Sequence, residues 1–313
     1  MPCELIAECC QNHNGSREVL KRMIHAASEA GATYAKIQAL RSSELTFRER
    51  FEDGELFADG TTKTIKRPFR AEQERLQKLD LNNEDEVWFV DECKRAGIKP
   101  MITVFTRFSS ERLIDAGYEA VKIASYDCKS TALLKEVAQN FKFVLVSTGA
   151  SLDTEISDAV KIFKRDQVSF LHCVTIYPTP LEQLHMNRMD WLRQFSRKVG
   201  FSDHTSPANT ALKASKLAIA LEADFVERHF TVLEPNETRD GPVSINPEQL
   251  RELCEFAKLP VETRLEKLTA DWQKWNVGLG ERTRELSAAE LLNRDYYSGR
   301  VASWRNGEQV SNQ

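Results

Sequence analysis

The residues best suited to chemistry are two histidines, His204 and His229, in the C-terminal third of the chain, and each closes a short apolar run typical of a β-strand. A lone strand-end histidine is more often a hydrogen-bonded core group than a ligand. Two on neighbouring parallel strands, each with a carboxylate close by (Asp203 and Glu227), instead favour a catalytic metal site with open coordination positions. Imidazole and oxygen ligands suit Mn²⁺, our first expectation, with Co²⁺, Zn²⁺ or Mg²⁺ as alternatives.

Lys36 and Lys122 are the second chemical signal, because each lies inside an apolar run, Tyr34–Gln38 and Ala120–Ala124. A lysine is rarely buried without a partner. One such lysine could extend along apolar surface to solvent. Two at equivalent places, with serines and threonines around them, favour a bound anion that carries phosphate and carboxylate groups. A Schiff-base role for one lysine is the alternative.

These residues belong to a repeat of strand followed by helix. The expected strands are residues 4–8, 34–38, 99–105, 120–124, 143–147, 168–173, 199–202 and 224–229. Helical patterns separate them, including residues 207–221 and 247–259. Eight units over about 260 residues predict an α/β fold, a (β/α)8 TIM barrel with a short C-terminal tail and an active site at the carboxyl ends of the strands. A doubly wound sheet is the rival, but the first strand lacks its glycine-rich phosphate turn.

Two segments fall outside the repeat. Residues 39–80 are charged, with a glycine-containing piece at 59–62 and basic residues up to Arg70, which indicates a functional or partly ordered loop. Residues 276–313 form a tail with a helical piece at 287–292, too short for a second core by itself.

Composition excludes several classes of protein. The formal net charge of the 313 residues is −4 with both signs dispersed, so we expect no nucleic-acid or membrane partner. No apolar run approaches a membrane span, and the N-terminus lacks a signal-peptide pattern. The seven cysteines show no paired zinc-ribbon spacing, so we expect reduced thiols in a cytoplasmic protein.

If the barrel is right, its strand ends are the site. Polar residues gather there while the middles of the strands are apolar, a one-sided pattern that packing alone would not choose. The candidates at these ends, and in the loops that follow, are Glu8, Asn12, Lys36, Gln38, Thr103, Lys122, Ser125, Asp127, Ser147, Tyr177, Ser202, His204, His229 and Asp240.

The chain resembles the sialic acid (N-acetylneuraminate) synthase family. The motifs that carry the resemblance are Ile6-Ala7-Glu8, Asn12-His13-Asn14-Gly15, Lys36-Ile37-Gln38, Lys122-Ile123-Ala124-Ser125, Ser147-Thr148-Gly149, Tyr177-Pro178-Thr179-Pro180, Phe201-Ser202-Asp203-His204-Thr205 and Glu227-Arg228-His229-Phe230-Thr231. Their order and spacing match over roughly residues 4–260.

The resemblance implies a transferase that condenses phosphoenolpyruvate (PEP) with an open-chain aldose, an amino sugar such as N-acetylmannosamine, to give a nonulosonic acid and phosphate. By motif, His204 and His229 would bind the metal, and Glu8 and Asp127 would act at the reacting centre. Asn12, Gln38 and Asp240 would face the sugar. The residues that would hold PEP are Lys36, Thr103, Lys122, Ser125, Ser147, Tyr177 and Ser202.

The resemblance also implies a homodimer in which an antifreeze-like domain gives an arginine to the partner's sugar site. Here residues 1–275 would be the synthase barrel, and residues 276–313 a linker and the remnant of that domain. Thr175 replaces the family's Asn, and Asp127 stands where Glu is common. Both changes touch the sugar side.

Two other functions stay open. One is an octulosonate- or heptulosonate-type synthase acting on a phosphorylated sugar, whose phosphate could meet Lys63, Lys66, Arg67 and Arg70. The other is a non-catalytic barrel with a binding role.

Overall fold

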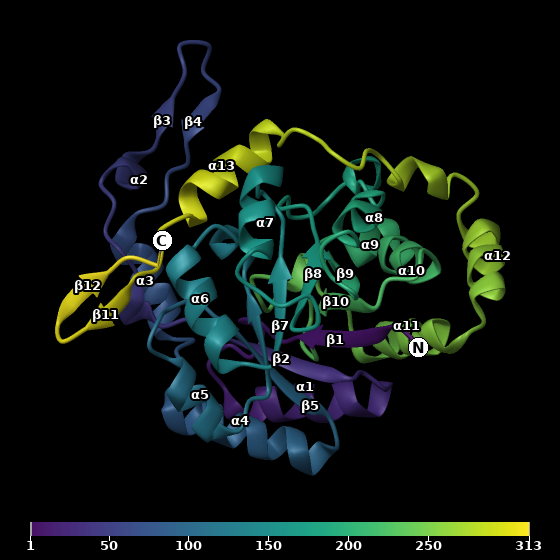
Figure 1. Cartoon of the computed structure of the whole chain (residues 1–313), viewed down its shortest axis with the longest axis horizontal. Coiled ribbons are helices and arrows are strands. Elements are labelled where there is room, and N and C mark those ends of the chain that lie inside the picture. The colour runs from purple at the N-terminus through teal and green to yellow at the C-terminus, as the bar shows by residue number, and fades with distance from the viewer. Residues whose placement is uncertain (1, 313) are drawn as a thin grey trace.

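Eight parallel strands close into a barrel in the computed structural model, which describes residues 2–312 (Figure 1). The strand order around the barrel is β1-β10-β9-β8-β7-β6-β5-β2. The predicted TIM barrel is therefore confirmed. The barrel strands are β1 (Glu4–Glu8), β2 (Tyr34–Ala39), β5 (Lys99–Val104), β6 (Ala120–Ile123), β7 (Phe143–Ser147), β8 (Val168–His172), β9 (Val199–Asp203) and β10 (Phe225–His229).

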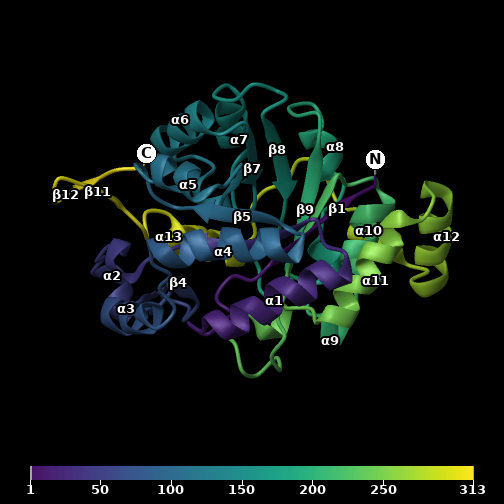
Figure 2. The ribbon, with the colours of Figure 1, turned by 90° about the horizontal axis from the view of Figure 1, so that it is seen from below.

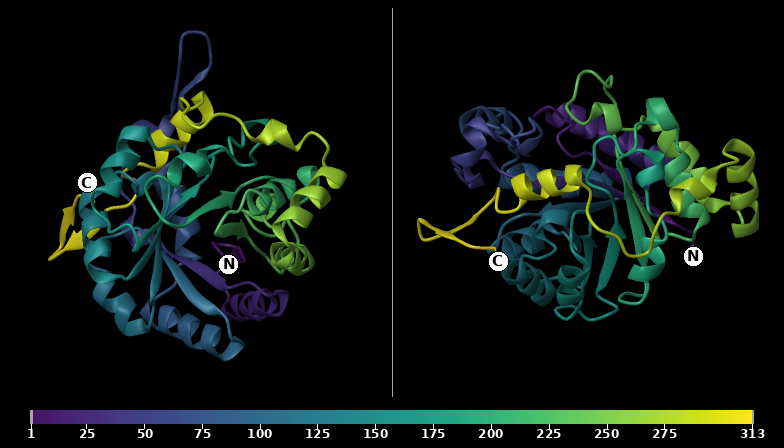
Figure 3. Two further views of the ribbon diagram at one scale, coloured as in Figure 1. Left: turned by 45° about the vertical axis from the view of Figure 1, so that its right-hand side comes forward. Right: turned by 90° about the horizontal axis from the view of Figure 1, so that it is seen from above.

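Helices surround this barrel on its outside, as the views in Figures 2 and 3 show. Their ends follow local signals: Ser16 accepts a hydrogen bond from the backbone N–H of Val19 to begin α1, and Gly31, at φ 94°, ends it. The helices that follow barrel strands are α1 (Arg17–Ala30), α4 (Asn83–Ala96), α5 (Ser110–Ala116), α6 (Thr131–Asn140), α7 (Asp153–Val160), α8 (Arg188–Leu192), α9 (Pro207–Thr210), α10 (Lys213–Ala220) and α11 (Pro247–Lys258).

One predicted helix is interrupted. Residues 207–221 form two helices, α9 and α10, because Ala211 between them adopts φ 53°. An alanine seldom takes this left-handed backbone, so no residue-type signal marked the break.

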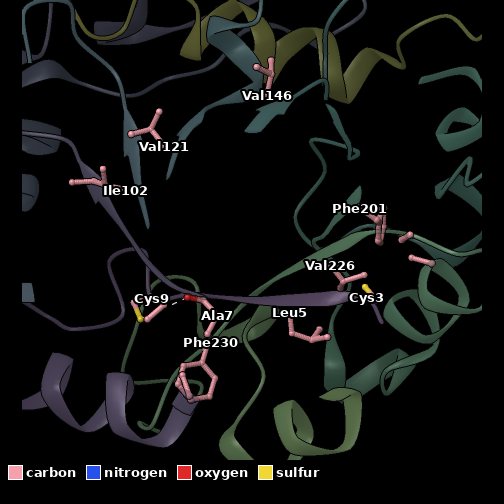
Figure 4. Close-up of a cluster of buried hydrophobic side chains, with 14 of the residues drawn as sticks. Cys3, Leu5, Ala7, Cys9, Ile102, Val121, Val146, Phe201, Val226 and Phe230 are labelled. Atoms are coloured by element: carbon pink, nitrogen blue, oxygen red, sulfur yellow. Dashed lines mark hydrogen bonds between the residues drawn. The ribbon is translucent and has the colours of Figure 1, made fainter. Parts of the chain in front are cut away.

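Side chains of the barrel strands divide between two cores. Those pointing outward pack against the helices, and Figure 4 shows Leu5, Ile102, Val121 and Phe201 in this outer core. Those pointing inward fill the amino end of the barrel with a smaller apolar cluster of Ile6, Tyr34, Met101, Ala120, Leu145, Leu171 and Phe225. The barrel is thus plugged at one end, and any cavity must open at the other.

The insertion and the tail are ordered additions to the barrel. Residues 39–80 contain α2 (Arg50–Asp53), a hairpin of β3 (Glu55–Leu56) and β4 (Thr62–Thr64), and α3 (Phe69–Gln77). After α11 come α12 (Val261–Asp271), α13 (Ala288–Tyr297) and a hairpin of β11 (Ser303–Arg305) and β12 (Glu308–Val310). Figure 1 shows α13, in yellow, beside the β3–β4 hairpin. Within residues 2–312 no helix is long and apolar enough to cross a membrane.

Candidate active site

The register of the barrel brings the predicted strand ends together. Glu8 on β1 is paired with Lys36 on β2 and with His229 on β10. Because side chains alternate along a strand, Glu8 lies on the same inward face as Ile6, two residues earlier. Six of the eight barrel strands therefore change along one face from a residue of the inner apolar cluster to a polar residue two positions later; the exceptions are β8, where Leu171 precedes Cys173, and β9, where Gly200 precedes Ser202.

These polar ends line a cavity of about 440 Å³ at the open end of the barrel. It includes every predicted site residue except Asn12, namely Glu8, Lys36, Gln38, Thr103, Lys122, Ser125, Asp127, Ser147, Tyr177, Ser202, His204, His229 and Asp240. The fold therefore brings these predicted residues together around one cavity.

The two lysines at the base of the cavity are held by carboxylates. Lys36 forms an ion pair with Glu8, lies 3.7 Å from Glu227 Oε2 and donates to Thr103 Oγ1 at 2.8 Å. Lys122 forms an ion pair with Glu227 Oε1. Burial lowers the pKa of Lys36 to about 7. Burial alone would raise the pKa of Glu227, but the charges of Lys122 and Lys36 lower it to about 2, so Glu227 is ionised.

Hydroxyl groups complete the base of the cavity. Ser202 Oγ donates to Glu227 Oε1 at 3.0 Å, and Ser125 Oγ accepts from the backbone N–H of Gly149 at 3.2 Å. Ser147 Oγ is buried and has no hydrogen-bond partner within the described structure. A buried hydroxyl without a partner is costly, and a bound anion would satisfy this one.

Asp127 also lines the cavity and accepts from Ser130 Oγ at 2.8 Å. Burial raises the pKa of its carboxyl to about 6. A carboxylate with such a pKa can accept a proton near neutral pH, as a general base must.

The two histidines are neighbours, with ring centroids 5.6 Å apart, and Tyr177 stacks 4.3 Å from His204. Burial and the nearby His229 lower the pKa of His204 to about 3, and burial also lowers the pKa of His229. Both rings are therefore neutral, as metal ligands must be. His204 Nδ1 donates to the carbonyl of Val174 at 2.9 Å, which leaves Nε2 free to bind a metal.

His229 Nδ1 is buried and has no hydrogen-bond partner among the described residues. It lies 3.9 Å from Asp240 Oδ2, and Asp240 accepts from the thiol of Cys10 at 2.9 Å. The residues present therefore fit a divalent metal.

The expectation that Asp203 supports a histidine is wrong. Asp203 follows Ser202 by one residue, so it points to the outside of the barrel wall. There it pairs with Arg228 at 2.6 Å, and both side chains are fully buried. Glu227 does face inward, but it pairs with the lysines rather than with a histidine.

Asn12 does not line the cavity. It is fully buried in the loop after β1, and its Nδ2 donates to the carbonyl of Phe230 at 2.8 Å and to Ser244 Oγ at 2.9 Å. Asn12 therefore fixes the loop that follows β10, which carries Asp240, instead of facing a sugar.

Arginines form the outer wall of the cavity, and sequence reasoning missed most of them. Arg75, Arg239 and Arg300 contact the carboxylate of Glu72 at 2.9, 3.4 and 2.5 Å. Arg67 lies with its guanidinium carbon 4.5 Å from the ring centroid of Tyr296. Of the four basic residues expected from the insertion, Arg67 lines the cavity, whereas the described contacts of Lys63, Lys66 and Arg70 are with Glu55, Asp53 and Glu74.

The tail supplies part of this wall from the same chain. Tyr297, at the end of α13, stacks on Tyr126 with ring centroids 4.5 Å apart, and Arg300 follows three residues later. The backbone N–H of Thr46 donates to the carbonyl of Arg300 at 2.9 Å, which joins the tail to the insertion. Contacts between segments so distant in sequence leave no periodic signal.

Comparison with known proteins agrees with this geometry. The profile of the NeuB family matches residues 23–265. The chain is 28% identical over 264 residues to the N,N'-diacetyllegionaminic acid synthase of Campylobacter jejuni, covering 80% of this chain and 74% of that protein. It is 27% identical over 270 residues to the N-acetylneuraminate-9-phosphate synthase of Mus musculus, covering 82% and 70%.

A crystal structure of the N-acetylneuraminic acid synthetase of Leptospira borgpetersenii, in complex with citrate, is similar over 95% of this chain and 91% of that chain. The TM-score is 0.69 and the sequence identity 25%. The family profile spans most of the barrel, including β2 and the strands from β5 to β10 that carry the lysines and histidines. The chain therefore belongs to the NeuB family and is an enzyme of the sialic acid synthase type.

Proposed function

We propose that this enzyme condenses PEP with an open-chain N-acylated amino sugar, similar to N-acetylmannosamine, to give a nonulosonic acid and phosphate. The observation that carries the proposal is that one cavity has two chemically different parts. Two lysines and several hydroxyls lie at its base, and a pair of neutral histidines lies on its wall. A small anion with phosphate and carboxylate groups would thus meet a metal-activated carbonyl group inside a single pocket.

The base of the cavity suits PEP. Lys36, Lys122 and Ser202 would donate to its phosphate and carboxylate oxygens, exchanging the present contacts with Glu8 and Glu227 for the ligand. Ser147 Oγ would gain the partner that it now lacks. These groups would also stabilise the charge that moves onto phosphate as it leaves.

Carbon 3 of PEP would attack the aldehyde carbon of the sugar, and water would then add at carbon 2. A divalent metal, which we propose to be Mn²⁺, would be held by His204 and His229 and would act as a Lewis acid towards the aldehyde oxygen. Asp127 would be the base for the water, because burial raises its pKa to about 6, which suits proton transfer near neutral pH. Glu8 is fixed by Lys36 and by the backbone N–H of Cys10 at 2.7 Å, so we propose that it orients the lysine.

A phosphate-release assay with PEP, Mn²⁺ and a panel of aldoses tests this proposal, with mass spectrometry of the product. We expect release with an N-acylated hexosamine and a product mass equal to both substrates plus water minus phosphate. Reactions without PEP are the negative control, and Lys122→Met should release phosphate more slowly than the wild type at limiting PEP. No release with any aldose would contradict the proposal and favour a non-catalytic barrel.

A second acceptor class, a sugar carrying a phosphate or carboxylate group, is favoured by the outer wall. Four arginines line it, and three of them share the single carboxylate of Glu72. The excess positive charge would attract an anionic substituent at the far end of the sugar. In that case Arg300→Gln should raise KM for N-acetylmannosamine 6-phosphate by about 10–100-fold, since a hydrogen bond to a charged group contributes about 1.5–3 kcal/mol. An equal effect on the unphosphorylated sugar would contradict this acceptor class.

Two further properties are proposals drawn from the family. Assembly as a homodimer can be measured by light scattering of the purified chain. A cytoplasmic location can be measured by fractionation of the source cells.

A further inference from the structure

We propose that Cys10 is a ligand of the metal ion, in a site that it forms with His229 and Asp240 and that His204 completes. The proposal deepens the proposed function, which needs a metal, but it concerns the ligand set alone. It assigns to the cation a thiolate that the pair of histidines did not suggest.

The three side chains converge from separate parts of the chain. Cys10 follows β1 by two residues, His229 ends β10, and Asp240 lies in the loop after β10. One ligand atom from each lies within 4.8 Å of the others, a group found among the described residues. Metal–ligand bonds of about 2.0–2.3 Å place ligand atoms roughly 3–4 Å apart around a shared ion. The 2.9 Å from Cys10 Sγ to Asp240 Oδ2 and the 3.9 Å from Asp240 Oδ2 to His229 Nδ1 are close to this range.

The unpartnered Nδ1 of His229 is an independent indication that a cation binds beside it. The residue is only 8% exposed, and its Nδ1 has no hydrogen-bond partner among residues 2–312. Leaving a buried polar nitrogen unpaired costs about 1–3 kcal/mol. A cation between His229 and Asp240 would satisfy this nitrogen, whereas the Cys10–Asp240 hydrogen bond by itself does not.

The loop that carries Asp240 is held firmly over Cys10. Asn12 donates to Ser244 Oγ, and Ser244 Oγ donates to the carbonyl of Asp240 at 2.7 Å. Gly241 leaves no room for a side chain, because a Cβ there would lie 2.0 Å from the carbonyl oxygen of Pro235. Such support for a ligand is what a pre-formed metal site requires.

His204 would be the fourth ligand. It is not a member of the group within 4.8 Å, but its ring lies 5.6 Å from that of His229 and its Nε2 is free. With a thiolate present, the site should bind Zn²⁺, Co²⁺ or Fe²⁺ more tightly than the Mn²⁺ proposed above and should bind Mg²⁺ poorly, because soft ligands select softer metals; Mn²⁺ would then occupy the site through its availability rather than its affinity. The metal preference therefore distinguishes this site from one made of imidazole and oxygen ligands.

The test is cobalt binding to metal-depleted full-length protein, followed by absorption spectroscopy. We expect a thiolate-to-cobalt charge-transfer band in the near ultraviolet. Cys10→Ser should lose this band and bind Co²⁺ about tenfold or more weakly. Cys9→Ala is the matched control, since Cys9 is the adjacent buried thiol and points into the outer core (Figure 4). The band should persist in this control.

The proposal is overturned if the wild-type spectrum lacks the thiolate band, or if Cys10→Ser retains it. X-ray absorption of the zinc-loaded wild type gives the same answer without any variant, since a sulfur ligand appears at about 2.3 Å. The outcome is separable from that of the proposed function. A thiolate band without phosphate release would refute the activity alone, and phosphate release without the band would refute the ligand assignment alone.

Discussion

The buried pair of Arg228 and Asp203 should be one of the most sensitive points of the barrel wall. Arg228 and Asp203 are adjacent to His229 and Ser202, respectively, but lie on the opposite face of the strands. Arg228 donates to the carbonyl of Asp203 at 3.1 Å and to the carbonyl of Thr205 at 2.8 Å. Arg228 therefore fixes the carboxyl end of β9, and His204 is the first residue after that strand.

Replacing Arg228 with methionine keeps much of the volume but leaves the carboxylate of Asp203 buried. That carboxylate still accepts from the backbone N–H of Thr205 at 2.8 Å and from Ser215 Oγ at 2.5 Å. Its charge, however, loses its only partner of opposite sign among the described ion pairs. Removing one partner of a buried pair costs about 3–5 kcal/mol, which is a large fraction of a stability of about 5–15 kcal/mol.

Urea unfolding followed by tryptophan fluorescence should show this loss in Arg228→Met. The double variant Arg228→Met with Asp203→Asn removes both charges; the amide oxygen of the new Asn can accept from the N–H of Thr205, and its NH₂ group can donate to Ser215 Oγ. It should recover about 2 kcal/mol or more relative to Arg228→Met, because no buried charge is left unpaired. A loss below about 1 kcal/mol in Arg228→Met, or a double variant no more stable than the single one, would refute the reasoning.

Three further predictions concern the cavity and its support. The rate of phosphate release should rise with pH through about 6, because a base must lose its proton and burial raises the pKa of Asp127 to about 6; Asp127→Asn should lower the rate about 100-fold or more and remove this step from the pH profile. Lys122→Met should raise KM for PEP about 10–100-fold in steady-state kinetics, and an unchanged KM would exclude Lys122 from the PEP site. Gly200→Ala should destabilise the barrel by about 1–3 kcal/mol in urea unfolding, since a Cβ would lie 2.4 Å from Leu171 Cδ2 and 2.6 Å from the carbonyl oxygen of Phe225. An unchanged urea midpoint would show that the inner apolar cluster rearranges to accept the added methyl group.

The sequence predicts the barrel and the inner cavity because both depend on local patterns. Alternation along β2 places Lys36 on the same face as Tyr34, two residues earlier, and register then brings it to Glu8. The same alternation would have placed Asp203 outside the barrel, since Asp203 is one residue from the inward-facing Ser202. Cys10 lies beyond the end of β1 and has φ 44°, so alternation alone does not place it in the cavity.

The outer wall lies beyond such reasoning. Arg300 reaches Glu72 across 228 positions of sequence, and this contact depends on how α13 packs against the insertion. No residue spacing, helix cap or apolar periodicity in either segment predicts the contact between Arg300 and Glu72. The role of Asn12 was hidden for a related reason, because its partners Phe230 and Ser244 lie 218 and 232 positions away.

Because Tyr297 and Arg300 line the cavity, the barrel and the complete cavity form in a fixed order while the chain is being translated. All eight barrel strands precede this segment in the sequence, so they leave the ribosome first. The barrel core can form at that stage, while its mouth still lacks one wall. A nascent chain should therefore reach a folded barrel before it gains a finished cavity, and competence to bind the sugar should be acquired only when α13 docks beside the β3–β4 hairpin.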